Sequence, residues 1–133
     1  MSGITVMWDM DDKQAIRYVA DGNWTWTDMQ HAVNASNAML DEIGRRTNFI
    51  YDMRTSAGVP SGALANLRRF IGKEHRFSGE QVVVGAKRSG LVLLAQGLLD
   101  MIYKLYKPKW RLQFADTLEE ARTLLGEHEK VQP

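Results

Sequence analysis

The amino-acid sequence predicts an α/β fold with one mixed, mostly parallel five-stranded sheet and four helices, in the order β-β-α-β-α-β-α-β-α. Three observations support this class. Two short segments near the start, Ile4–Asp9 and Ala15–Ala20, alternate between apolar and polar residues around a polar loop, as the strands of a hairpin do. Phe49–Tyr51 and Val82–Val84 are apolar without alternation, which is typical of central strands covered on both faces. The segments between and after them repeat apolar residues at about the 3.6-residue period of a helix.

The first predicted helix carries signals at both of its ends. Thr25 followed by Asp28 forms a capping box, in which each side chain accepts a hydrogen bond from the other residue's backbone. Trp24 and Met29 occupy the two positions of a hydrophobic staple. Gly44 follows the last apolar position, where a glycine commonly ends a helix. We therefore expect a helix that begins after Thr25 and ends at Gly44.

Three further helices and one more strand are expected downstream. A helix is predicted from about Ser61 to Glu74, and another from about Ser89 to Tyr106. Trp110–Ala115 alternates as a strand, and a second capping box, Thr117 with Glu120, begins the final helix. Because β-α-β crossovers are right-handed in nearly all proteins, the later strands should run largely parallel and the opening hairpin should supply an antiparallel edge.

Composition limits the class of protein. The 133 residues suit one domain that spans positions 1–133. The 17 basic and 16 acidic residues leave a net charge of +1, which argues against a nucleic-acid partner. No cysteine is present, so disulfides and thiolate metal sites are excluded. The longest apolar run, Leu91–Ala95, continues through Gln96 and Gly97 to Leu99, which is about half of the ~20 residues that a membrane-spanning helix needs. We expect a cytoplasmic protein.

The most informative stretch is Asn48–Leu64, which predicts a buried strand, a loop of small residues and the beginning of a helix. Loops at such junctions commonly carry the binding contacts of α/β domains. We therefore predict an interaction surface on this loop and on the helix after it. Its residues are Asp52, Arg54, Thr55, Ser56, Pro60, Ser61, Gly62 and Arg68. Asp52 has an alternative role, accepting backbone hydrogen bonds that shape the loop, and Trp26 either joins the core or lies exposed near a ligand or partner.

The chain carries no motif that specifies a reaction, a metal or a cofactor. Ser61, His75 and Asp52 are the residue types of a hydrolytic triad, but the Gly-x-Ser-x-Gly elbow is absent. His75 would also lie about 20 Å from Ser61 along one helix, at a rise of ~1.5 Å per residue. The histidines lack the spacing of a metal site, and Gly85–Gly90 lacks the spacing of a phosphate loop. We therefore predict a protein that is not an enzyme.

The predicted helix from Ser89 to Tyr106 has more apolar surface than one contact with a sheet requires. A second apolar row accompanies its core stripe: Val92, Leu99, Tyr103 and Tyr106. Three explanations remain open, namely complete burial, a homodimer or partner interface, and the lining of a pocket for an apolar ligand or lipid. The basic residues from Lys104 to Arg111 suit either a solvated rim or weak contact with an anionic membrane surface.

Three stretches, in this order, resemble the STAS fold, named for sulphate transporters and anti-sigma-factor antagonists, and particularly its SpoIIAA-like branch. Asp21–Asp28 is similar to the segment that opens the first helix of that family. Phe49–Arg54 is similar to its central strand, and Gln81–Ala86 with Leu112–Arg122 to its closing elements. The resemblance covers nearly the whole chain. It implies a regulatory module without enzymatic activity that binds a protein partner.

In anti-sigma-factor antagonists, a serine just before a glycine at the start of the second helix is a phosphorylation switch. Ser61, before Gly62, matches that position. A phosphate there would meet the unpaired N–H groups of a helix N-terminus and would add about −1.5 to −2 charges to the surface. The family has an aspartate and a small residue before the serine, whereas this chain has Val59 and Pro60. The alternative is that Ser61 serves only as the helix N-cap, a position that serine favours strongly.

Overall fold

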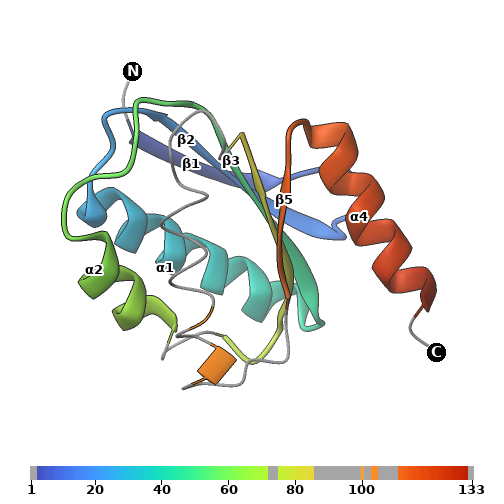
Figure 1. Cartoon of the computed structure of the whole chain (residues 1–133). Coiled ribbons are helices and arrows are strands. Elements are labelled where there is room, and N and C mark those ends of the chain that lie inside the picture. Colours follow the sequence, from blue (N-terminus) through green and yellow to red (C-terminus); the bar gives the residue numbers. More distant parts are fainter. Residues whose placement is uncertain (1–2, 72–74, 86–99, 101–102, 105–110, 132–133) are drawn as a thin grey trace.

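The computed structural model describes residues 3–71, 75–85, 100, 103–104 and 111–131 (Figure 1). The described part contains one five-stranded sheet and three helices. The strands are β1 (Gly3–Trp8), β2 (Ala15–Gly22), β3 (Thr47–Ser56), β4 (Ser78–Val84) and β5 (Leu112–Ala115). The helices are α1 (Trp26–Ile43), α2 (Ala63–Ile71) and α4 (Leu118–Val131). The predicted helix from Ser89 to Tyr106 lies almost entirely outside the described residues.

The strands lie side by side in chain order, β1-β2-β3-β4-β5. β1 and β2 pair antiparallel, whereas β2–β3, β3–β4 and β4–β5 each pair parallel. One row of aligned residues crosses the whole sheet: Val6, Tyr18, Tyr51, Val83 and Phe114. The predicted α/β class and the single mixed five-stranded sheet are therefore confirmed.

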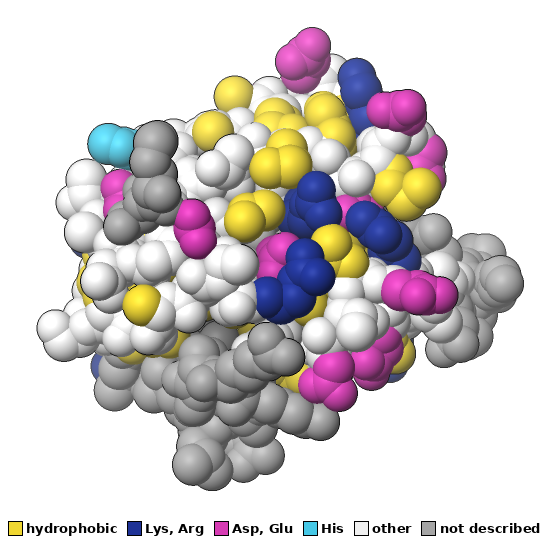
Figure 2. Space-filling model, turned by 90° about the horizontal axis from the view of Figure 1, so that it is seen from above, with side chains coloured by type: hydrophobic (Ala, Val, Ile, Leu, Met, Phe, Trp, Pro, Cys, Tyr) yellow, Lys and Arg dark blue, Asp and Glu magenta, His cyan; other side chains and the backbone are white. Residues whose placement is uncertain are grey.

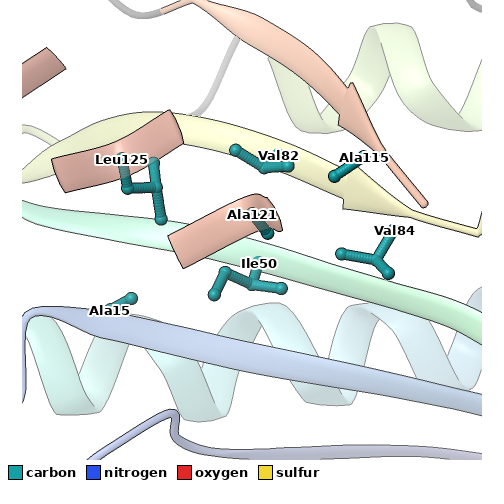
Figure 3. Packing of buried hydrophobic residues seen from close by; sticks show 7 residues of the cluster. All are labelled: Ala15, Ile50, Val82, Val84, Ala115, Ala121 and Leu125. Atoms are coloured by element: carbon teal, nitrogen blue, oxygen red, sulfur yellow. The ribbon is translucent and has the colours of Figure 1, made fainter. Parts of the chain in front are cut away.

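Two apolar layers cover the sheet because successive side chains of a strand point to opposite faces. On one face, Phe49 and Ile16 pack with Leu40 of α1. On the other face, Ile50 packs with Ala121 and Leu125 of α4, together with other side chains of the cluster in Figure 3. We call these the α1 face and the α4 face. Figure 1 shows α1 and α2 on one side of the sheet and α4 on the other.

The predicted ends of the first helix are confirmed. The Asp28 backbone N–H donates to Thr25 Oγ1 at 3.1 Å, and the Thr25 N–H donates to Asp28 Oδ2 at 2.8 Å. Gly44 has the left-handed φ of 67°, and its N–H donates to the Leu40 carbonyl at 2.9 Å. Trp24 and Met29, the two staple residues, belong to one hydrophobic cluster. Local signals are sufficient here because every contact lies within a few residues of the helix end.

The second predicted capping box forms, but one of its two hydrogen bonds has a different partner. The Glu120 N–H donates to Thr117 Oγ1 at 3.0 Å, as expected. The Glu120 carboxylate, however, accepts from the backbone N–H of Asp116 at 3.1 Å rather than from that of Thr117. This hydrogen bond therefore connects the first turn of α4 to Asp116, the residue that directly follows β5.

The start of α2 differs from the prediction. The helix begins at Ala63, and the Gly62 carbonyl accepts the first helical hydrogen bond from the Asn66 N–H at 3.0 Å. Gly62 has φ +83°, a conformation that residues with a side chain rarely adopt. Gly62, and not Ser61, is therefore the N-cap of α2. The backbone enters the helix at Gly62 because a glycine tolerates a positive φ.

Candidate functional site

The segment Asp52–Gly62, at the carboxyl end of β3, is the candidate site. Its first half belongs to the sheet rather than to a loop, because β3 continues to Ser56. Thr55 and Ser56 align with Asp21 and Gly22 of β2 after a register shift in the pairing of the two strands. The Ala57 N–H then donates to the Gly22 carbonyl at 2.9 Å, which extends the pairing by one residue. The sequence did not predict this extension because Arg-Thr-Ser lacks the apolar signal of a buried strand.

Two tryptophans hold the second half of the segment. Trp24 Nε1 donates to Ser56 Oγ at 2.9 Å, and that hydroxyl donates to the Gly58 carbonyl at 2.7 Å. Trp26 Nε1 donates to the Ser61 carbonyl at 2.8 Å. The two indoles meet edge to face, with ring centroids 5.0 Å apart. The entry to α1 therefore fixes both ends of the stretch from Ser56 to Ser61.

The Ser61 side chain is exposed on this fixed backbone. None of the described residues donates a hydrogen bond to its hydroxyl or accepts one from it, and only its backbone carbonyl is engaged, by Trp26. Most other members of the predicted surface are exposed as well. They are Arg54, Thr55, Gly62 and Arg68. Ser56 and Pro60 are half-buried, so the accessible part of the predicted surface lies on the remaining residues.

Asp52 is buried, with 5% of its surface exposed, and it pairs with Arg54. Arg54 donates to the carboxylate through Nε at 2.9 Å and Nη2 at 2.8 Å, and its backbone N–H donates to Oδ1 at 3.2 Å. Burial by itself would raise the pKa of Asp52, but these hydrogen bonds and the positive charges of Arg54 and Arg17 hold the pKa below its ordinary value. Asp52 therefore remains ionised, and the shaping role that we expected as an alternative is the one its contacts support.

A second buried carboxylate lies on the same face of the sheet. Asp9, whose side chain is 4% exposed, accepts two hydrogen bonds of 2.9 Å from the Nε and Nη2 atoms of Arg122 in α4. Arg17 Nη1 lies 3.8 Å from the same carboxylate. Together with Asp52 and Arg54, these residues form what we call the ion-pair cluster. Figure 2 shows basic and acidic side chains side by side in the middle of the displayed surface, with apolar side chains around them.

Sequence reasoning missed the ion-pair cluster. Asp9 and Arg122 are 113 residues apart, and nothing local links them. One weak signal existed, since Arg17 interrupts the apolar residues of a strand on the face that Ala15 shares with the core. The cluster joins the turn after β1 to β2, β3 and α4. The ion-pair cluster stabilises the fold beside the candidate site and does not itself bind, because its carboxylates are buried and already paired.

A hollow of about 300 Å³ opens beside the segment. It is lined by Trp26, Thr27, Gln30, His31, Asn66 and Arg69, from α1 and α2. No carboxylate is among these residues, and His31 and Arg69 are exposed. The sequence did not decide whether Trp26 joins the core or lies exposed. In the structure Trp26 is half-buried, between the hollow and the Ser61 carbonyl. The candidate site is thus a fixed, polar to basic surface.

The three residues of a conceivable triad are not brought together. His75 Nε2 bonds Asp41 Oδ1 at 2.6 Å, and its Nδ1 accepts from the Phe77 N–H at 3.1 Å. Asp41 lies near the end of α1, whereas Ser61 bonds Trp26 at the beginning of that helix. These two points are separated by roughly 22 Å of helix at a rise of ~1.5 Å per residue. Direct proton transfer between Ser61 and His75 is therefore ruled out.

Among the described residues, no group of three or more potential ligands is placed to hold a metal ion. None of the helical segments that the structure describes is long and apolar enough to cross a membrane. Of the apolar row predicted on the third helix, Val92, Leu99 and Tyr106 lie outside the described residues, and Tyr103 is 39% exposed.

Comparison of the chain with protein-family models and with curated proteins finds no match. The candidate site therefore has to be interpreted from its own geometry.

Proposed function

We propose that this chain is a regulatory protein-interaction module without enzymatic activity, of the STAS type and SpoIIAA-like, located in the cytoplasm. It has a mostly parallel sheet with a fourth helix between β4 and β5. It binds a protein partner through the Ser61 surface, which we define as Thr55, Ser61, Gly62 and Arg68. Phosphorylation of Ser61 would switch that binding.

The observation that carries the proposal is the contrast between the backbone and the side chain of Ser61. The backbone carbonyl is held by the Trp26 indole at 2.8 Å, whereas the hydroxyl is exposed and has no partner among the described residues. A modifying enzyme needs an accessible hydroxyl, and a partner benefits from a surface that is ordered before binding. Both requirements are met at this residue.

The local charge supports a switch. Ser61 precedes the first turn of α2, whose N–H groups have no helical acceptors. The first turn contains no acidic residue, and Arg68 and Arg69 follow in the last turn. A phosphate would be stabilised by the N–H groups and would convert a basic surface into one with a local negative charge. A partner that recognises the basic surface would then be released.

The test is capture of partners from a lysate of the source cells by immobilised wild-type chain, Ser61→Ala and Ser61→Asp, with quantitative mass spectrometry. We expect a protein that binds the wild type and Ser61→Ala, and that binds Ser61→Asp at least about tenfold less, because the added charge opposes docking at the surface. Binding of that protein should then be reproduced with purified components.

Asn34→Asp is the matched control, since Asn34 is exposed on α1 and the substitution adds the same charge outside the Ser61 surface. The new carboxylate can still accept the hydrogen bond that Gln30 Nε2 donates to Asn34 Oδ1 at 2.9 Å. Loss of capture in both charged variants would indicate a general effect of charge and would contradict the switch. Equal capture by all variants, or no specific capture, would overturn the proposal. A lipid that co-purifies with the gently extracted chain in native mass spectrometry would favour the alternative function of an apolar-ligand carrier.

A further inference from the structure

The outer edge of β1 is open in the part of the chain that the structure describes. β1 pairs only with β2 there, and it forms one edge of the sheet (Figure 1). Its six residues, Gly-Ile-Thr-Val-Met-Trp, include no charge and no proline. Natural sheets usually protect a long edge by charges, prolines, bulges or short length, because unpaired backbone groups recruit other strands. β1 has none of these protections.

The opposite edge of the sheet provides an internal comparison. β5 has only four residues and is flanked by Arg111 and Asp116. A short strand between charged residues offers few backbone groups to a second chain. Among the described residues, one edge of the sheet is therefore protected and the other is open, as expected if the β1 edge has a partner.

The pairing with β2 determines which backbone groups of β1 point outward. The Asp9 N–H donates to the Ala15 carbonyl at 2.9 Å, so the backbone of Asp9 points toward β2. In an antiparallel ladder this direction alternates along the strand. Thr5 and Met7 therefore also face β2, whereas the N–H and C=O groups of Ile4, Val6 and Trp8 face outward.

We propose that a second copy of this chain pairs antiparallel with the β1 edge, about a two-fold axis at Val6. In this register Val6 faces the second copy's Val6, Ile4 faces its Trp8, and Trp8 faces its Ile4. All three outward residues then form hydrogen-bonded pairs, giving about six backbone hydrogen bonds. A register shifted by two residues would leave Trp8 unpaired in one direction and Ile4 unpaired in the other. The edge is thus self-complementary, as an isologous dimer interface requires.

The side chains fit the same register on both faces of the sheet. Ile4, Val6 and Trp8 are only partly buried in the cluster beneath α1, so each has apolar surface left for its counterpart. On the α4 face, the exposed Thr5 would lie opposite the second copy's Met7. Gly3 would lie opposite the second copy's Asp9, where the absence of a side chain leaves room for the ion pair with Arg122. No charged residue of β1 opposes the contact.

Sedimentation equilibrium of the full chain tests the proposal. We expect a dimer whose dissociation constant rises by roughly a hundredfold in Val6→Pro, because two hydrogen bonds are lost and each is worth about a factor of ten. The fold should survive, since none of the described residues pairs with the Val6 N–H and proline is tolerated on an edge strand. Thr5→Lys is the second variant. It places a charge at an exposed position of the monomer. In the dimer that charge would lie opposite the second copy's Met7 and diagonal to the same charge of the second copy, so the dimer should be weakened.

Cysteine cross-linking tests the register, because the natural chain contains no cysteine. Thr5 and the second copy's Met7 would be a non-hydrogen-bonded pair with Cα atoms about 4.5 Å apart, within disulfide range. Mixing differently tagged Thr5→Cys and Met7→Cys chains should therefore give a disulfide-linked heterodimer under mild oxidation. Met10→Cys, at an exposed position of the hairpin, measures the background of random collisions.

A wild-type chain that remains monomeric at submillimolar concentration would overturn the inference. So would a dimer that both Val6→Pro and Thr5→Lys leave intact, because it would use another interface. Cross-linking of Thr5→Cys with itself, and not with Met7→Cys, would contradict the register centred on Val6. The inference is independent of Ser61, and partner capture by the Ser61 surface can succeed or fail without affecting it.

Discussion

The two faces of the sheet satisfy their buried polar groups in different ways. The α4 face contains buried carboxylates that pair with arginines: Asp9 with Arg122, Asp52 with Arg54, and Glu80 with Arg46. The α1 side uses neutral hydrogen bonds instead: Tyr18 with Ser36, Trp24 with Ser56, and Tyr51 with Gln81. Charges therefore serve one side of the sheet, and aromatic rings with neutral partners serve the other.

The difference follows from how much of each face is covered. α4 contacts β3, β4 and β5, whereas the ion-pair cluster extends to β1 and β2, beyond that helix. Arg122 and Arg54 therefore keep contact with water and are 39% and 42% exposed, whereas Arg17 is 21% exposed and its Nε is buried without a hydrogen-bond partner among the described residues. An ion pair costs less to form where one partner stays hydrated. On the α1 face, Tyr18 is 4% exposed, and a charge there would lose nearly all of its hydration.

The largest expected effect comes from removing a carboxylate of the α4 face. Asp9→Ala leaves Arg122 and Arg17 without the carboxylate that both contact. Loss of one member of a buried ion pair should lower the free energy of unfolding by about 3 kcal/mol, measured by urea denaturation at pH 7. Arg122→Ala is the matched variant and should cost a similar amount, because the buried Asp9 carboxylate loses both 2.9 Å hydrogen bonds and keeps only Arg17, 3.8 Å away. A loss below about 1 kcal/mol for Asp9→Ala would show that the charges are better hydrated than their burial indicates.

An intermediate effect is expected from acid, through Asp52. Its pKa is lowered in the folded chain, so the unfolded chain takes up its proton first as the pH falls. The contribution of Asp52 to stability is thus complete above its ordinary pKa of 3.8 and is lost as the pH falls through the folded value. Asp52→Asn should cost about 2 kcal/mol at pH 7, as expected for hydrogen bonds to a charged group.

Urea denaturation at a series of pH values between neutral and about 3 measures this dependence. Wild type should lose stability more steeply than Asp52→Asn over the acid end of the series. Parallel curves for the two chains would mean that Asp52 and Arg54 do not interact in solution as they do in the structure.

The smallest effect is expected on the α1 face. Tyr18→Phe removes one neutral hydrogen bond, and Ser36 still donates to the Val33 carbonyl at 3.0 Å, so the cost at pH 7 should be about 1 kcal/mol. Alkali should separate the variants further. Burial raises the pKa of Tyr18 from 10.0 to about 12, so the unfolded chain loses the proton first and stability falls as the pH rises above 10.

Tyr18→Phe should flatten that alkaline decline, whereas the same change at the exposed Tyr103 should leave it in place. Absorbance of tyrosinate in the folded chain gives an independent measurement, since a tyrosine that ionises near pH 12 should be absent from Tyr18→Phe. An alkaline decline of equal slope in all three chains would show that Tyr18 is not buried in the folded state.

Much of the fold was predictable because its signals are local. The Thr25–Asp28 capping box and the Gly44 helix end depend on residues within a few positions of each other. Alternation predicted the hairpin, and unbroken apolar runs predicted β3 and β4. The predicted start of α2 was too early, because Gly62 with its positive φ is the N-cap although serine is usually favoured at that position.

The candidate site was predictable as a location but not as an arrangement. Ser61 lies on an exposed segment after a central strand, where α/β domains commonly bind their partners. That Trp24 and Trp26 hold this segment could not be deduced, since the hydrogen bonds connect positions 32 and 35 residues apart. Asp52 belonged to the predicted surface, yet its burial beside Arg54 removes it from contact with a partner.

The sequence by itself determined the α/β class, the order of the described elements and the ends of the first helix, because these follow from periodicity and from contacts between near neighbours. Only the tertiary structure decided that Asp9 meets Arg122 and that two indoles fix the backbone around Ser61. It also decided that, among the described residues, the β1 edge is open while the β5 edge is short. These features depend on the register between strands and on the packing of helices against them. Register and packing are properties of the whole chain, and a local pattern of residues does not encode them.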